Sequence, residues 1–131
     1  MDSKTYQAGV SRTLAQRPNR KVSDKEFNIL HAALGTVTEA AEIADIMKGV
    51  LIKGKELDKD HLIEEVGDVM YYLGVIANET GVSFEDIMEV NANKLKARYP
   101  NGFTAEKYDR DNRNLSAEQI AMVKSGRGQN G

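Results

Sequence analysis

Apolar residues recur three and four positions apart along most of the chain, which is the spacing of a helix that buries one face. The clearest apolar stripe consists of Leu62, Val66, Val69, Leu73 and Ile76. Between Pro18 and Pro100, the alternation of β-branched and polar residues that is typical of strands is sparse. The pattern therefore predicts an all-α protein.

Residues that start and stop helices divide this pattern into four main helices. Ser23 with Glu26, and Ser83 with Asp86, form capping-box patterns at two helix starts. Gly54 is placed to end the longest helix, because glycine readily adopts the left-handed conformation of a helix end. The expected ranges are about 6–14, 24–52, 58–81 and 83–99.

The helix expected over residues 58–81 has a second apolar face, which contains Ile63, Met70 and Ala77 with the small residues Gly67 and Gly74 between them. Two of its sides therefore require burial. The central segment from Ser23 to Tyr99 is short, and a domain of that size hides only about 60 to 65% of its unfolded surface. We expect subunit association, as a homodimer or a dimer of dimers.

Composition excludes several classes of protein. The net charge of −2 without a basic run argues against a nucleic-acid partner. The absence of cysteine excludes disulfides, thiolate zinc sites and cysteine nucleophiles. The longest apolar run, residues 69–77, is about half of what a bilayer crossing needs, and residues 1–20 lack a signal-type apolar core. We expect a soluble cytoplasmic protein without a membrane partner.

Two pairs of acidic residues carry the candidate chemistry: Glu39 with Glu42, and Glu65 with Asp68. Each pair is spaced i, i+3, so both carboxylates of a pair share one helix face. Helical acids are usually solvated, but none of these four has Lys or Arg three or four positions away. A bound cation is the alternative source of positive charge, and oxygen ligands without cysteine favour Mg²⁺, or Mn²⁺ as a substitute, over zinc.

Two further features of the sequence bear on this candidate site. Gly35 precedes Glu39 by one turn, which indicates either a close approach of two helices or a glycine tolerated for packing. Asn91, Lys94 and Arg98 share a stripe of the helix expected over residues 83–99. One amide and two cations suit phosphate oxygens, although such a stripe is also common on exposed helices.

These residues resemble the MazG-type all-α nucleoside triphosphate pyrophosphohydrolase superfamily, in particular its short single-domain bacterial and phage members. The family signature is ExxE followed by ExxD, and here EAAE (39–42) and EVGD (65–68) are separated by 22 residues. The likeness runs from YQAGVSRT at Tyr6 to NANKLKARYPNGF at Phe103. Two departures from the common glycines of the first motif are Thr38 and Ala41.

The resemblance implies a MazG-like helical bundle over residues 1–103. Residues 104–131 then form a polar extension with a weak helix over about 116–124 and a mobile end. The implied reaction is Mg²⁺-dependent hydrolysis of (deoxy)nucleoside triphosphates to the monophosphate and pyrophosphate. The implied metal ligands are Glu39, Glu42, Glu65 and Asp68.

For the substrate, the resemblance implies binding by Asn91, Lys94 and Arg98, and we expect Glu39 to be the catalytic base. Tyr72 is expected either to stack on the nucleobase or to serve in packing. Narrower substrates such as dUTP, dCTP or phosphoribosyl-ATP remain open, as does a non-catalytic dimerisation or regulatory module. His31 and His61 are interpreted as structural or solvent-facing, and the GxxxxGK pattern that ends at Lys55 lacks the Ser or Thr of a phosphate-binding loop.

Overall fold

The computed structural model describes residues 1–16, 19–110 and 113–126, with side chains to residue 123. Within these ranges the regular secondary structure is helical and there is no β-strand, which confirms the all-α prediction. The helices are α1 (Ser3–Arg12), α2 (Asp24–Lys53), α3 (Lys59–Thr80), α4 (Phe84–Arg98), α5 (Ala105–Tyr108) and α6 (Leu115–Gly126). The expectation of four main helices is therefore corrected to six in the described ranges, because the polar extension adds α5 and α6.

The helix ends form as the capping residues predicted. The Glu26 backbone N–H donates to Ser23 Oγ at 3.2 Å, and the Ser23 backbone N–H donates to the Glu26 carboxylate at 3.0 Å. The same reciprocal pair joins Ser83 and Asp86 at the start of α4. Gly54 ends α2 with φ of 66°, a left-handed conformation that glycine adopts without a Cβ penalty. Local sequence therefore sets these helix boundaries.

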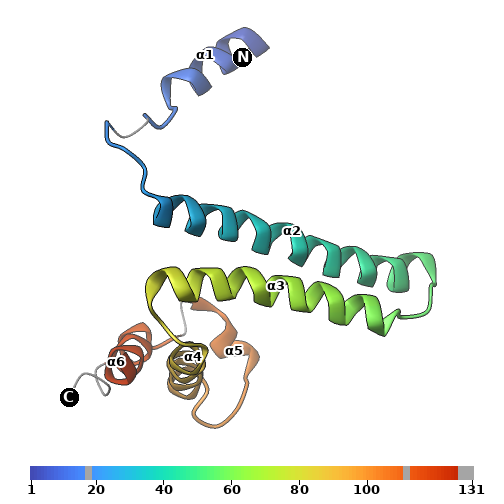
Figure 1. Cartoon of the computed structure of the whole chain (residues 1–131), viewed down its shortest axis with the longest axis vertical. Helices are drawn as coiled ribbons and strands as arrows, with labels where there is room; N and C mark the ends of the chain where they lie inside the picture. The colour runs from blue at the N-terminus through green and yellow to red at the C-terminus, as the bar shows by residue number, and fades with distance from the viewer. Residues whose placement is uncertain (17–18, 111–112, 127–131) are drawn as a thin grey trace.

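Helices α2 and α3 form an antiparallel hairpin and lie side by side along most of their length (Figure 1). Near the open end of the hairpin, Asn28 Nδ2 donates to Glu79 Oε1 at 2.7 Å. Ala32 and Gly35 on α2 are buried, as is Ala77 on α3. Small residues on these faces let the two backbones approach, which positions the acidic pairs across the hairpin.

Gly35 marks a close contact between the two helices. A Cβ added to Gly35 would collide with ring carbons of Tyr72 on α3. The close-approach interpretation of Gly35 is thus confirmed, and the group that needs the space is the Tyr72 ring.

We expect Gly35→Ala to destabilise the protein by up to about 2 kcal/mol. Overpacking costs roughly 1 to 3 kcal/mol, whereas alanine adds only about 1 kcal/mol of helix propensity. Denaturant unfolding measures the difference. The matched control is Gly67→Ala on α3, where an added Cβ meets nothing within 4 Å, so the propensity gain should appear alone. Equal effects of the two substitutions would contradict the packing argument.

Helix α6 packs on α4, forming a second helical pair that lies below the hairpin in the view of Figure 1. Glu118 on α6 is only 3% exposed. The structure thus contains the helix that the sequence predicts over about 116–124, and it gives this helix a packing partner and a buried ionic contact. Residues 127–131, where the mobile end was expected, lie outside the described residues.

Helix α1 stands apart from both helical pairs in Figure 1. The side chains of Tyr6 and Val10 on this helix, and that of Leu14 beyond its end, are exposed. In the described part of the chain, no helix is both long enough and apolar enough to cross a membrane.

The face of α2 that points away from α3 is also uncovered. Phe27, Leu30, Leu34 and Val37 recur there at helical spacing and are 60 to 68% exposed. Among the described apolar side chains, only those of Ala32 and Ala77 are buried. A single chain therefore leaves most of its large apolar side chains in contact with water.

Candidate metal centre

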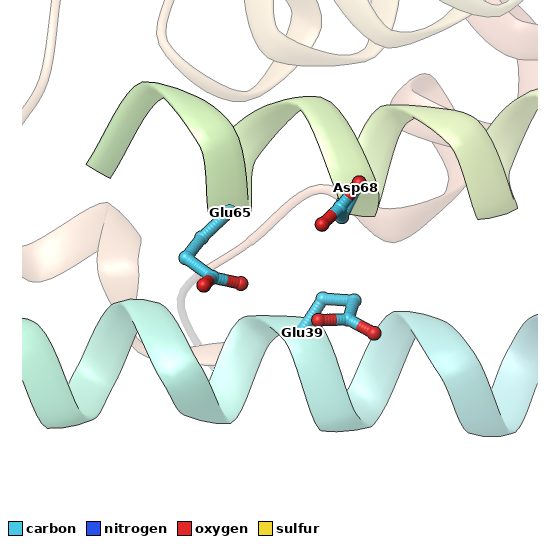
Figure 2. A group of neighbouring side chains, drawn as sticks. All are labelled: Glu39, Glu65 and Asp68. Atoms are coloured by element: carbon cyan, nitrogen blue, oxygen red, sulfur yellow. The ribbon is translucent and has the colours of Figure 1, made fainter. Parts of the chain in front are cut away.

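Three of the four predicted acids converge between α2 and α3. Figure 2 shows Glu39 on α2 facing Glu65 and Asp68 on α3, with the carboxylates directed into the space between the helices. One oxygen from each carboxylate lies within 4.8 Å of the others. Three hard oxygen ligands at this separation suit a divalent cation such as Mg²⁺ or Mn²⁺. The donor set therefore fits the metal that the sequence predicted.

The cluster is crowded with negative charge. Glu65 is buried, Glu39 is half-buried and Asp68 is exposed. Desolvation raises the pKa of Glu39 above its ordinary value, and the charges of Asp68 and Glu65 raise it further. All these causes disfavour the ionised form, so a cation at this place would relieve the repulsion.

His61 contacts the cluster from one turn before Glu65. Its Nε2 lies 3.0 Å from Glu65 Oε1, a hydrogen bond in which the ring N–H donates to the carboxylate. From the sequence, His61 is expected to be structural or solvent-facing, and no hydrogen bond to Glu65 is predicted. The i, i+4 spacing was the signal that could have found it. A histidine in this position fixes the orientation of a carboxylate ligand.

Glu42 lies outside the cluster of three. With Asp45 and His61 it lines an adjoining cavity of about 350 Å³ near the loop that connects α2 to α3. Its charge still contributes to the raised pKa of Glu39. An i, i+3 neighbour is rotated by about 60° around the helix, so Glu39 points at α3 and Glu42 lies to its side.

The structure places Tyr72 in the packing between helices. Its ring occupies the space above Gly35 and makes an edge contact with His31, with ring centroids 5.9 Å apart. Tyr71 also contacts it edge-on, at 5.2 Å. The packing alternative for Tyr72 thus has direct contacts, while nucleobase stacking stays a prediction.

The predicted phosphate-binding stripe lies on α4. In the described part of the chain, α4 packs on α6 and not along the α2–α3 hairpin. Asn91 is exposed, and Lys94 and Arg98 are partly buried. One chain therefore does not pack these residues against the acid cluster. Arg98 instead makes an ion pair with Glu118.

Comparison with known proteins gives a consistent picture. Residues 27–103 match the MazG nucleotide pyrophosphohydrolase domain. The chain is 33% identical to the Gene 37 protein of Mycobacterium phage L5 over 101 residues, which cover 74% of this chain and 88% of that protein.

Two Bacillus proteins are also similar. A phosphoribosyl-ATP pyrophosphatase of Bacillus cereus (strain AH187) is 32% identical over 77 residues, 59% of this chain and 71% of that protein. The uncharacterized protein YvdC of Bacillus subtilis (strain 168) is 44% identical over 41 residues, 31% of this chain and 39% of that protein. No solved structure matches the chain significantly.

Proposed function

The chain belongs to the MazG nucleotide pyrophosphohydrolase domain family, and on that premise we propose that it hydrolyses nucleoside triphosphates to the monophosphate and pyrophosphate with Mg²⁺. The observation that carries the proposal is the convergence of Glu39, Glu65 and Asp68 between α2 and α3. We further propose that it acts in the cytoplasm and clears surplus or unwanted nucleotides.

Each acid has a distinct role in this proposal. Glu65 and Asp68 hold the metal from α3, and His61 orients Glu65. Glu39, from α2, also binds the metal and accepts the proton of the attacking water. Glu42, which lies beside the cluster, would complete the ligand set. Divalent ions, when bound, neutralise polyphosphate charge and lower the pKa of coordinated water.

Substrate binding falls to Asn91, Lys94 and Arg98, with Tyr72 beside the metal ligands. Because α4 does not pack along the hairpin of its own chain, we propose that the working form is a homodimer or a dimer of dimers. Association would cover the exposed apolar faces of α2 and α3, and it is the state in which we expect α4 to serve the metal centre.

A screen for released pyrophosphate tests the function and the alternatives together. The wild-type protein is incubated with common and modified (deoxy)nucleoside triphosphates and with phosphoribosyl-ATP, in Mg²⁺ and in EDTA. We expect Mg²⁺-dependent release from nucleoside triphosphates. Turnover of phosphoribosyl-ATP alone would favour the activity named for the Bacillus cereus relative, and selective turnover of dUTP or dCTP would indicate a narrower enzyme. No release from any compound would favour a non-catalytic dimerisation or regulatory module.

A further inference from the structure

A buried carboxylate on α6 binds two arginines from elsewhere in the chain. Arg98, at the end of α4, donates to Glu118 through Nε at 3.2 Å and through Nη2 at 3.0 Å. Arg113, which precedes α6, donates through the same two atoms at 3.0 and 2.6 Å. Both contacts are of the bidentate kind, which fixes the plane of each guanidinium as well as its position.

The three side chains carry an excess of positive charge. Hydrogen bonds from Arg113 and then Arg98 lower the pKa of Glu118 from 4.5 to about 2, so this carboxylate is ionised at neutral pH. One negative charge therefore faces two guanidinium groups, which leaves a net charge of +1. If the contact served only to pin α6 on α4, a single arginine would suffice to balance Glu118.

Glu118 does not use every donor of the two arginines, and Arg98 is in addition hydrogen-bonded to the side chain of Tyr99. Glu118 accepts from Nε and Nη2 of each guanidinium, so the Nη1 group of each is not used by this carboxylate. The side chains of Arg98 and Arg113 are 18% and 19% exposed, whereas that of Glu118 is 4% exposed. The carboxylate is thus the inner partner, and the cations lie nearer the solvent.

We propose that Glu118 is a positioning residue that holds Arg98 and Arg113 as a two-arginine clamp for the phosphate groups of the nucleotide. This inference rests on the proposed function and adds two residues to it. Both additions lie beyond residues 27–103, the part of the chain that matches the family. The clamp gives the C-terminal extension a task in substrate binding, and the fork of guanidinium donors matches the oxygens of a phosphate group.

Three variants separate a phosphate clamp from a structural pin. Glu118→Gln removes the charge that holds both arginines. Arg113→Gln removes the excess positive charge but leaves the Arg98–Glu118 pair in place. This variant therefore still tests the clamp if Glu118→Gln does not fold. The control is Met122→Ala, which shortens a half-buried side chain on α6 one turn after Glu118 without touching the ionic contact.

The measurements are KM and kcat for the best nucleotide, the Kd of inorganic pyrophosphate without Mg²⁺ by calorimetry, and Tm. We expect Glu118→Gln and Arg113→Gln to raise KM and the pyrophosphate Kd about tenfold, with little change in kcat. Arg113→Gln removes charge-assisted hydrogen bonds to the phosphates, and Glu118→Gln releases both arginines from the orientation in which they make such bonds. Met122→Ala should lower Tm and leave KM and Kd near wild type.

Unchanged pyrophosphate binding and KM in a folded Arg113→Gln variant would overturn the clamp, even with a lowered Tm. Equal weakening of pyrophosphate binding in Met122→Ala would also overturn it, because loosening of α6 would then explain the effect. If wild type hydrolyses no nucleotide, the proposed function fails, yet the pyrophosphate Kd still tests the clamp separately.

Discussion

Replacing Glu65 by glutamine is expected to remove both Mg²⁺-dependent pyrophosphate release and the rise in Tm that Mg²⁺ gives the wild-type protein. Glu65 is the buried member of the three-carboxylate cluster, and its oxygen lies within 4.8 Å of oxygens of Glu39 and Asp68. A neutral amide keeps the size of the side chain and loses the charge that binds a hard cation. Since the metal contributes several kcal/mol of transition-state stabilisation, the rate should fall by a factor of about 100 or more.

The matched control is Glu64→Gln, the same substitution one residue earlier on α3. Glu64 is exposed and is not a member of the cluster. The Glu64→Gln variant should retain both the pyrophosphate-releasing activity and the rise in Tm on adding Mg²⁺. Measuring Tm with Mg²⁺ and with EDTA also separates the loss of metal binding from a general loss of stability. In EDTA the Glu65→Gln variant should be at least as stable as wild type, because it has lost one of three repelling charges. A Glu65→Gln protein that still gains Tm on adding Mg²⁺ would count against the metal centre.

Leu34→Asp is expected to convert the proposed homodimer into monomers. Leu34 is 60% exposed on the face of α2 that points away from α3, within the uncovered stripe that also contains Leu30 and Val37. A carboxylate in an apolar subunit interface loses its water without gaining a partner, which costs several kcal/mol. The dissociation constant should therefore rise by about 100-fold or more. Light scattering or sedimentation over a range of concentrations measures it.

The helix itself should survive this substitution, because Leu34 is exposed in the single chain. Far-ultraviolet circular dichroism at high protein concentration checks that helical content is kept. Asn78→Asp on α3 adds the same charge at another exposed helical position and should leave the association unchanged. If Leu34→Asp associates as tightly as wild type, the interface lies on another face of the chain. The two predictions are linked, because activity lost on dissociation would indicate that the α4 cations come from a neighbouring copy.

The sequence by itself determined the helices and identified the acidic residues of the candidate site. Capping boxes at Ser23 and Ser83, and the left-handed glycine at position 54, are local features, so they specify helix ends without knowledge of the fold. The missing counter-charges around Glu39 and Glu65 are also visible in the linear pattern, since helical spacing alone decides which side chains are neighbours.

Only the tertiary structure decided which groups meet across elements. The hairpin packing directs Glu39 at α3 and leaves Glu42 to one side, because the relative rotation of two helices depends on their packed surfaces and not on either sequence alone. The space at Gly35 is taken by Tyr72, which lies on the opposite helix. Arg98 is hydrogen-bonded to Glu118, which lies twenty residues later on α6, a helix that the sequence pattern predicts only weakly. The spacing of residues along the sequence determines which side chains are neighbours within a helix. Contacts between helices depend on how the apolar faces of all the helices pack together.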